Sequence, residues 1–374
     1  MPQLSIQYKT ERKKKDLPPG LFAQQLVAWY QTNKRDLPWR TTHDPYKIWL
    51  SEVILQQTRV AQGLPYYQKF VAQYPTVADL ANAPEEEVMR LWQGLGYYTR
   101  ARNMHACARI VTTQLNGQFP DNYQDLLRLK GIGKYTAAAI ASIAYQEPVP
   151  VVDGNVYRVL SRVFGVEADI TSTQGIKVFF ELAQSLVPQE NVDLYNQAIM
   201  EFGALQCAPA KPRCHSCIFK EYCVAFHTAK QHVLPLKTKK VKIRQRFFHY
   251  LVLQHDNKLY MKRRDEKDIW AGLYDFYLIE ATQLQEALPA EDALVASLQR
   301  HQAPINLTPK LYKHVLTHQR LYIHFFHVQA TDALMAELAP WLRQTGAKAF
   351  AVDVTQRLPK PTLINNFLEK EFYS

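Results

Sequence analysis

The stretch LKGIGKYTA, residues 129–137, decides the fold of the first half of the chain. Helical patterns precede and follow it, and Gly131 and Gly133 flank a single aliphatic residue. Two glycines in this spacing allow a tight hairpin between the helices, with backbone N–H groups pointing outwards. Those groups can hold a phosphate, together with the N-terminus of the next helix, which carries Lys134. The stretch therefore predicts a helical hairpin, over about residues 129–140, that binds a nucleic-acid backbone without reading its sequence.

Helical patterns extend outwards from this hairpin, from Leu21 to about residue 226. Apolar residues recur three and four positions apart, and short turns containing Gly, Pro or Asn separate the segments. Helices are predicted over residues 21–30, 45–55, 65–73, 76–81, 84–94, 98–115, 123–129, 135–145, 156–164, 175–186 and 193–205. Pro45 is taken as a first helical position, where proline is favourable.

Four of the five cysteines, Cys207, Cys214, Cys217 and Cys223, lie in one short loop after the last of these helices. Because no secretory signal is evident, this group indicates a metal site before it indicates disulfides. On the residues alone, four thiolates suit either a [4Fe–4S] cluster or zinc. The fifth, Cys107, lies in a helical pattern and is predicted to be a small core residue.

The composition is basic, with a formal net charge of +11 and a pI of about 9.2 over 374 residues. This charge suggests a polyanionic partner, although it also serves plain solubility. The length predicts two or three domains. We expect residues 1–20 to form a basic tail. Residues 227–246 are expected to form a basic linker that either skirts phosphates or merely tethers two domains. No apolar run is long enough to span a membrane.

From residue 247 the pattern changes to strands. Residues 247–253 and 258–262 flank Asp256-Asn257, which predicts a hairpin. Further strands are predicted over residues 274–279, 314–317 and 321–328, with helical stretches near residues 282–300 and 331–344. Residues 247–374 are therefore predicted to form an α+β domain of their own.

Two carboxylates draw attention as candidate catalytic groups. Glu52 lies among apolar residues, so it is either an exposed helix glutamate or a buried one whose raised pKa keeps it protonated for general acid catalysis. Asp153 precedes a helix that begins near Val156, where an aspartate is most simply a cap. A low-pKa aspartate there would also suit a cationic sugar transition state. Two carboxyl groups, one with a raised pKa and one with a low pKa, are the usual arrangement for cleaving a glycosidic bond.

Several segments in the same order resemble one enzyme family, the adenine glycosylase branch (commonly called MutY) of the endonuclease III superfamily of DNA glycosylases. The similarity runs through about residues 21–225 and rests on residues 37–40 (LPWR), 52–58, 93–98 (QGLGYY), 131–136 and 152–156 (VDGNV). The resemblance implies a multidomain, mostly α N-terminal catalytic region over residues 21–226, in which the hairpin is a helix–hairpin–helix.

The same resemblance bears on the cofactor and on the type of chemistry. The cysteine spacing resembles the cluster loop of this superfamily and implies a [4Fe–4S] cluster in place of zinc. Members with lyase activity carry a lysine where this chain has Tyr135. Because tyrosine cannot form a Schiff base, the resemblance implies base removal without an efficient strand-cutting step.

The implied substrate is double-stranded DNA containing adenine opposite 8-oxoguanine or guanine. The adenine is flipped out of the duplex, Glu52 protonates its N7, and Asp153 stabilises the cationic sugar. Tyr135 and Asn155 orient these groups, and Arg40 helps to hold the adenine. The remaining implied DNA contacts are Gln57, Thr58 and Tyr97 at the base stack, and Gly131, Gly133 and Lys134 at the backbone. For Tyr97 a core position is the alternative.

The C-terminal domain resembles, more loosely, the Nudix-like domain of the same family. The run G-x5-E-x7-R-E-x2-E-E that a Nudix hydrolase needs for magnesium is missing, so the resemblance implies recognition of 8-oxoguanine without hydrolysis. The segments 269–274 and 315–318 match the domain, with Thr317 where the family usually has serine. His318 is then a recognition residue, or else a structural one among several histidines.

Two alternative functions stay open at this point: a bifunctional glycosylase-lyase, and a non-catalytic iron–sulfur protein that binds DNA. The absence of coiled-coil heptads predicts a monomer. We expect a bacterial cytoplasmic protein associated with the nucleoid.

Overall fold

The computed structural model describes residues 17–18, 20–239, 242–265 and 268–373. The chain divides into two compact units. Residues 1–57 and 110–240 belong to unit 1, and residues 58–109 and 241–374 belong to unit 2. Most of the predicted basic tail and two residues of the predicted linker lie outside the described residues. Within the described ranges, no helix is both long enough and apolar enough to cross a bilayer.

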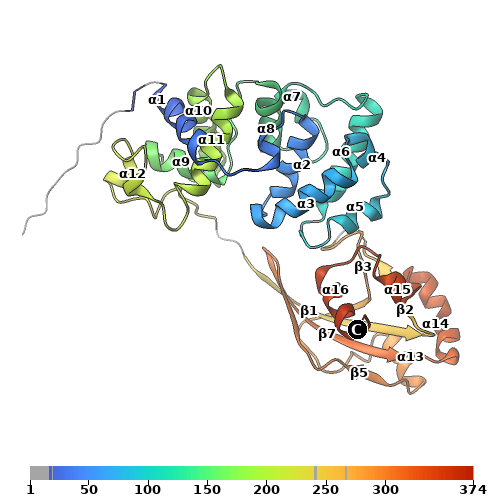
Figure 1. Cartoon of the computed structure of the whole chain (residues 1–374). Coiled ribbons are helices and arrows are strands. Elements are labelled where there is room, and N and C mark those ends of the chain that lie inside the picture. The colour runs from blue at the N-terminus through green and yellow to red at the C-terminus, as the bar shows by residue number, and fades with distance from the viewer. Residues whose placement is uncertain (1–16, 19, 240–241, 266–267, 374) are drawn as a thin grey trace, which may run out of the picture. The chain divides into compact units, whose positions relative to one another are not determined.

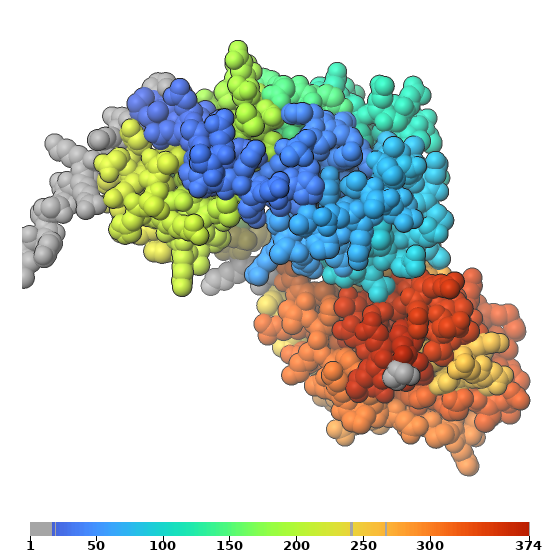
Figure 2. Space-filling model, in the orientation of Figure 1, coloured from blue at the N-terminus to red at the C-terminus, as the bar shows by residue number. Residues whose placement is uncertain are grey.

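Unit 1 consists of helices. They are α1 (Leu21–Asn33), η1 (Pro38–Arg40), α2 (Pro45–Leu55), α7 (Tyr123–Leu126), α8 (Lys134–Tyr145), α9 (Gly154–Phe164), α10 (Thr173–Leu186), α11 (Val192–Leu205), η2 (Cys214–Ser216) and α12 (Val224–His227). Helix α1 packs against α11 beside the cysteine loop (Figures 1 and 2), and the Tyr30 hydroxyl donates to Gln197 Oε1 at 3.0 Å. Phe22 packs on Phe219, 4.9 Å between ring centroids, and these side chains close the core of this region.

Most predicted helix starts lie within two residues of the observed ones. Pro45 occupies the first position of α2, and the Asp44 side chain accepts a hydrogen bond from Tyr46 N at 2.9 Å. The predicted start at Pro65 is wrong, because α3 begins at Val60. Pro65 lies in the second turn, where a proline removes one hydrogen bond without ending the helix.

Unit 2 combines helices from residues 58–109 with an α+β region. The helices are α3 (Val60–Gln73), α4 (Val77–Asn82), α5 (Glu85–Leu91) and the start of α6 (Thr99–Gln114), which ends in unit 1. The α+β region contains β1 (Arg244–His255), β2 (Lys258–Arg263), β3 (Tyr274–Asp275), β4 (Tyr277–Ala281), α13 (Ala293–Arg300), β5 (Ile305–Leu307), β6 (Tyr312–Val315), β7 (Gln319–Gln329), α14 (Asp332–Thr345), β8 (Lys348–Ala351), α15 (Val352–Thr355) and α16 (Thr362–Glu371).

The strands form one mixed sheet around β1. Strand β1 pairs in parallel with β7 and antiparallel with β2 and β4. The predicted hairpin between β1 and β2 is confirmed, with Gln254 opposite Leu259. Asp256 and Asn257 have φ values of 46° and 55°, so both adopt the left-handed conformation that a type I′ turn requires.

Both faces of this sheet are covered, since successive side chains of a strand point to opposite faces. Phe248 and Tyr250 of β1 face α16 and belong to one core cluster, whereas Leu251 and Leu253 belong to a second cluster with α13 and α14 (Figure 1). The predicted helical stretch at residues 282–300 is shorter than expected. Helix α13 begins only after Asp292, whose side chain caps it.

Candidate active site

Glu52 lies on α2 and is buried, with 7% of its surface exposed. It is therefore not an exposed helix glutamate. Burial raises the pKa of Glu52 to about 7, although the hydrogen bond from Tyr135 opposes this shift. A carboxyl with this pKa keeps a large protonated fraction at neutral pH and can donate its proton in a reaction.

Tyr135 connects the hairpin to this carboxyl. It lies in the first turn of α8, and its hydroxyl donates to Glu52 Oε2 at 2.5 Å. Burial, followed by the nearby charge of Glu52, raises the pKa of Tyr135 well above its usual value. The phenol is therefore neutral at physiological pH and acts as a hydrogen-bond donor.

Asp153 is the N-cap of α9. Its Oδ1 accepts hydrogen bonds from the backbone N–H groups of Asn155 and Val156, both at 2.8 Å, and its Oδ2 accepts one from Asn155 Nδ2 at 2.7 Å. The lowered pKa predicted from the sequence is wrong. Burial raises the pKa of Asp153 and outweighs these hydrogen bonds, and burial cannot be read from the cap position. All three partners are N–H donors, which is the environment of an ionised carboxylate.

The structure adds Glu201, a carboxylate that the sequence analysis did not single out. Arg35 Nε and Nη2 donate to its two oxygens at 2.8 and 2.6 Å, and Arg40 Nη2 donates to Oε2. Burial raises the pKa of Glu201, but the hydrogen bonds from Arg35 and Arg40 prevail and lower it to about 2. The Arg40 guanidinium also lies 5.4 Å from the Tyr30 ring centroid and donates from Nη1 to the Arg35 carbonyl at 3.3 Å, so three partners hold it in place.

The hairpin itself has the predicted form. Gly131 has a φ of 80°, a conformation that L residues with a side chain rarely adopt. Gly133 is exposed and directly precedes α8, and a Cβ atom there would meet nothing within 4 Å. Since the first N–H groups of a helix lack intrahelical partners, this exposed start beside Lys134 is suited to a phosphate.

The four cysteines of the 207–223 loop are all free thiols. Among the residues that the structure describes, no three of their sulfur atoms lie within 4.8 Å of one another. Thiolates are ligands of both zinc and iron–sulfur clusters, so these four residue types suit either group. Arg162 Nη1 lies 3.5 Å from Cys207 Sγ, and Phe219 N lies 3.4 Å from Cys217 Sγ. Such N–H···S contacts stabilise the sulfurs of a bound cluster.

Arg158 links this loop to the start of α9. It is buried, its Nε donates to the Cys207 carbonyl at 2.7 Å, and its Nη2 donates to Asn155 Oδ1 at 2.8 Å and the Gly203 carbonyl at 2.6 Å. Because Asn155 in turn donates to Asp153, the order of the cysteine loop and the orientation of the Asp153 carboxylate are physically connected.

Unit 2 holds a separate cavity of about 440 Å³. Its lining comes from three segments, residues 94–99, 268–271 and 314–319. Tyr97 is 45% exposed, so it is not a core residue, and its hydroxyl contacts the hydroxyl of Thr317. Thr317 and His318 are exposed in the turn between β6 and β7. The structure thus gathers Tyr97, Thr317 and His318 at one cavity.

Gln57 and Thr58 lie just after α2, with Gln57 exposed and at a φ of 54°. Thr58 belongs to unit 2, where both terminal nitrogens of Arg100 lie 3.5 Å from its hydroxyl.

Comparison with known proteins identifies the family. The model of the HhH-GPD superfamily of base excision DNA repair proteins matches residues 50–185, and the NUDIX domain model matches residues 249–370. The adenine DNA glycosylase of Buchnera aphidicola from Acyrthosiphon pisum is 35% identical over 257 residues, which cover 68% of this chain and 73% of the relative. The chain belongs to the adenine DNA glycosylase family.

Further relatives agree with this placement. The adenine DNA glycosylase of Buchnera aphidicola from Baizongia pistaciae is 33% identical over 308 residues, 81% of this chain and 85% of the relative. A solved structure of a thermostable thymine-DNA glycosylase, 32% identical, superposes with a TM-score of 0.52 over 56% of this chain and 96% of its own. The predicted fold class is confirmed: a helical helix–hairpin–helix region and an α+β Nudix-like domain in a DNA N-glycosylase.

Within this family member, sequence reasoning missed Arg35 and Glu201 as part of the site. A signal was present, since Glu201 lies between Met200 and Phe202 near the end of a helix that is largely apolar. The identity of its partners was not visible, because Arg35 and Glu201 are 166 positions apart in the chain.

Proposed function

We propose that this adenine DNA glycosylase family member removes adenine lying opposite 8-oxoguanine or guanine in double-stranded DNA. The observation that carries the proposal is the buried Glu52 carboxyl with a pKa near 7, close enough to Asp153 for the two charges to interact. A proton donor next to an anion is what cleavage of an N-glycosidic bond needs, because charge leaves on the base and develops on the sugar.

The steps follow from the positions of these groups. The adenine must leave the base stack, since its glycosidic bond is unreachable inside the duplex. Glu52 donates its proton to N7 of the adenine, and the bond between C1′ and N9 breaks. Asp153, held by the Asn155 and Val156 N–H groups, stabilises the cationic sugar. Glu52, now ionised, accepts a proton from the water that attacks C1′.

Tyr135 limits the reaction to base removal. Its hydroxyl orients Glu52 and has no amine with which to form a Schiff base to the sugar. Lys134 is exposed at the start of α8, and we assign it, with Gly131 and Gly133, to the DNA backbone. Arg40 is assigned to the adenine pocket, where its contact with Glu201 fixes its guanidinium. Gln57, Thr58, Tyr97, Thr317 and His318 are assigned to the opposite base and its stack.

We assign a [4Fe–4S] cluster to Cys207, Cys214, Cys217 and Cys223. When bound, the cluster supplies order to this loop and takes no part in bond cleavage. Lys211, Arg213 and Lys220 lie among the cysteines and present positive charge to a phosphate. We further propose that the protein works as a monomer, in a bacterial cytoplasm and on the nucleoid.

The direct test uses a duplex with a single adenine opposite 8-oxoguanine. After incubation with the purified protein, we expect strand breakage at the adenine only when alkali is added, because alkali cuts the abasic site. Breakage without alkali would indicate a lyase. If neither A opposite 8-oxoguanine nor A opposite guanine gives breakage after alkali, the proposal is wrong.

A further inference from the structure

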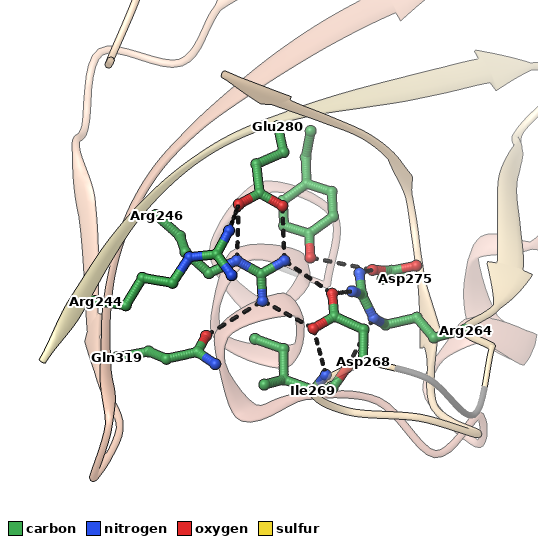
Figure 3. A network of polar contacts seen from close by, with 9 residues as sticks. Arg244, Arg246, Arg264, Asp268, Ile269, Asp275, Glu280 and Gln319 are labelled. Atoms are coloured by element: carbon green, nitrogen blue, oxygen red, sulfur yellow. Dashed lines mark hydrogen bonds and ion pairs between the residues drawn. The ribbon is translucent and has the colours of Figure 1, made fainter. Parts of the chain in front are cut away.

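Arg246, on the central strand β1, is buried within the C-terminal region, with 6% of its surface exposed. Its Nε and Nη2 donate to Glu280 at 2.8 and 2.7 Å, and its Nη1 and Nη2 donate to Asp268 at 2.8 and 2.9 Å. Nη1 also donates to Gln319 Oε1 at 3.2 Å. All five N–H groups of the guanidinium are therefore used, as Figure 3 shows.

Two of these partners belong to the loops that line the cavity of unit 2. Asp268 is the first residue of the lining segment 268–271, and its carboxylate also accepts a hydrogen bond from Ile269 N at 2.7 Å. Gln319 directly follows Thr317 and His318, and its carbonyl accepts from Leu316 N at 2.8 Å across the turn. A single side chain on a strand that is paired on both sides thus ties together two loops that come from distant parts of the sequence.

The loop at Asp268 is under additional restraint. Arg264 donates to Asp268 at 2.7 Å and to the Ile269 carbonyl at 3.0 Å, and Trp270 has a φ of 60°. A non-glycine residue in this conformation persists only where its surroundings hold it. The ring of Trp270 lies 5.5 Å from that of His314 in the strand before the turn, so the loop and the turn also pack together.

We propose that Arg246 is a positioning residue that sets the preference for 8-oxoguanine over guanine as the base opposite the adenine. This inference rests on the proposed function. 8-Oxoguanine differs from guanine by an oxygen at C8 and by a hydrogen at N7, which turns one acceptor into a donor. Discrimination by so few atoms requires hydrogen-bonding groups held to within about 0.5 Å. Arg246 fixes the backbone that carries Thr317 and His318 without touching the base itself.

The test compares Arg246→Lys with Arg244→Lys. Arg244 lies two residues earlier on β1, but its side chain is 69% exposed and makes a 3.5 Å ion pair with Glu280. Lysine cannot reproduce the planar fork of Arg246, whereas at position 244 it keeps the charge. Gln319→Leu is a second variant that removes the link to the turn and leaves the ion pairs of Arg246 intact. Thermal melts identify which variants fold.

Single-turnover excision of adenine is measured opposite 8-oxoguanine and opposite guanine, and the ratio of the two rates is the readout. We expect Arg246→Lys to lower the ratio about tenfold, as loss of a charge-assisted hydrogen bond implies. Gln319→Leu should lower it by a smaller factor, and Arg244→Lys should leave it within about twofold of the wild type.

An unchanged ratio in folded Arg246→Lys or Gln319→Leu overturns the inference, as does an equal fall of both rates, which indicates a merely structural role. If Arg246→Lys does not fold, Gln319→Leu decides. A wild-type protein that excises adenine without preferring 8-oxoguanine overturns this inference alone. A wild-type protein that excises no adenine overturns the proposed function and this inference with it.

Discussion

Glu52 in unit 1 and Arg246 in unit 2 are almost equally buried, but their surroundings differ. Glu52 receives a hydrogen bond from the neutral Tyr135 hydroxyl, and burial raises its pKa to about 7. Arg246 donates to two carboxylates and an amide, and the hydrogen bonds to Glu280 and Asp268 raise its pKa further. Hydrogen bonding offsets the burial of Glu52 only in part, so this carboxyl can donate its proton near neutral pH. Hydrogen bonds and ion pairs offset the burial of Arg246 fully, so its side chain stays charged and fixes the loops that it contacts.

Glu201 sharpens this comparison within unit 1. It is as buried as Glu52, but its partners are Arg35 and Arg40, and its pKa falls to about 2. Two buried glutamates of the same helical region therefore differ in protonation because of the charge of their partners.

The largest effect expected is that of Glu52→Gln. A glutamine keeps the shape and cannot donate the proton, so excision of adenine should fall by about 10²–10⁴-fold while binding to the duplex persists. Glu181→Gln, on the exposed face of α10, is the matched control and should keep the wild-type rate. Single-turnover excision and a gel-shift titration measure the two properties. Wild-type turnover in Glu52→Gln would remove Glu52 from the chemistry.

Tyr135→Phe should have an intermediate effect. The hydrogen bond from Tyr135 lowers the pKa of Glu52, so its loss raises that pKa and weakens the orientation of the carboxyl. We expect a rate about tenfold lower at neutral pH, with the decline of the rate at alkaline pH moved to higher pH. A pH–rate profile of both proteins measures the shift, and a decline that moves to lower pH contradicts the assigned hydrogen bond.

Glu52 and Glu201 should give the stability of the fold opposite dependences on pH. The pKa of Glu52 in the folded state is above its ordinary value of 4.5. The protonated Glu52 therefore adds to the free energy of unfolding below pH 4.5, and this stabilisation is lost as pH rises through about 7. The pKa of Glu201 is below 4.5. The ionised Glu201 therefore adds to the free energy of unfolding above pH 4.5, and this stabilisation is lost as pH falls through about 2. Each shift corresponds to roughly 3 kcal/mol at most.

At pH 8, Glu52→Gln should therefore unfold at a higher temperature than the wild type, and Glu201→Gln at a lower one. At pH 4.5 the advantage of Glu52→Gln should be gone. Thermal melts at both pH values check this. Equal changes of melting temperature in the two variants would show that the charge of the partners does not determine how these glutamates affect stability.

The smallest effect expected is that of Lys134→Ala. This variant removes an exposed charge that belongs neither to the surroundings of Glu52 nor to those of Arg246. If Lys134 meets a phosphate, the affinity for duplex should fall by a few-fold irrespective of the opposite base, and the salt dependence should weaken by about one ion. Lys177→Ala, on the exposed face of α10, is the control. A loss of affinity that depends on the opposite base would place Lys134 elsewhere.

Local signals allowed much of the fold to be predicted. Pro45, the cap at Asp153 and the turn at Asp256-Asn257 each act through the backbone of a few neighbouring residues, and all three lie where expected. The strands β5 and β8 and the helix α16 were missed. Strands of three and four residues carry too little periodicity to be recognised.

Site residues could be predicted where a single motif identifies them. Their pKa values and contacts could not, because these depend on residues that are distant in the sequence. Glu52 and Tyr135 were named, but only the structure shows the burial that raises the pKa of Glu52. The pKa of Asp153 was predicted in the wrong direction for the same reason. The three hydrogen-bond partners of Arg246 lie up to 73 positions away in the chain and leave no local sequence pattern.

The central claim is that Glu52 delivers its proton to the adenine from a buried carboxyl. The most direct measurement is the single-turnover rate of adenine release from a duplex with A opposite 8-oxoguanine, followed from pH 5 to pH 9. The rate should decline as pH rises through about 7, because Glu52 ionises there. A rate that stays constant across this range, or that rises with pH, would contradict general acid catalysis by Glu52.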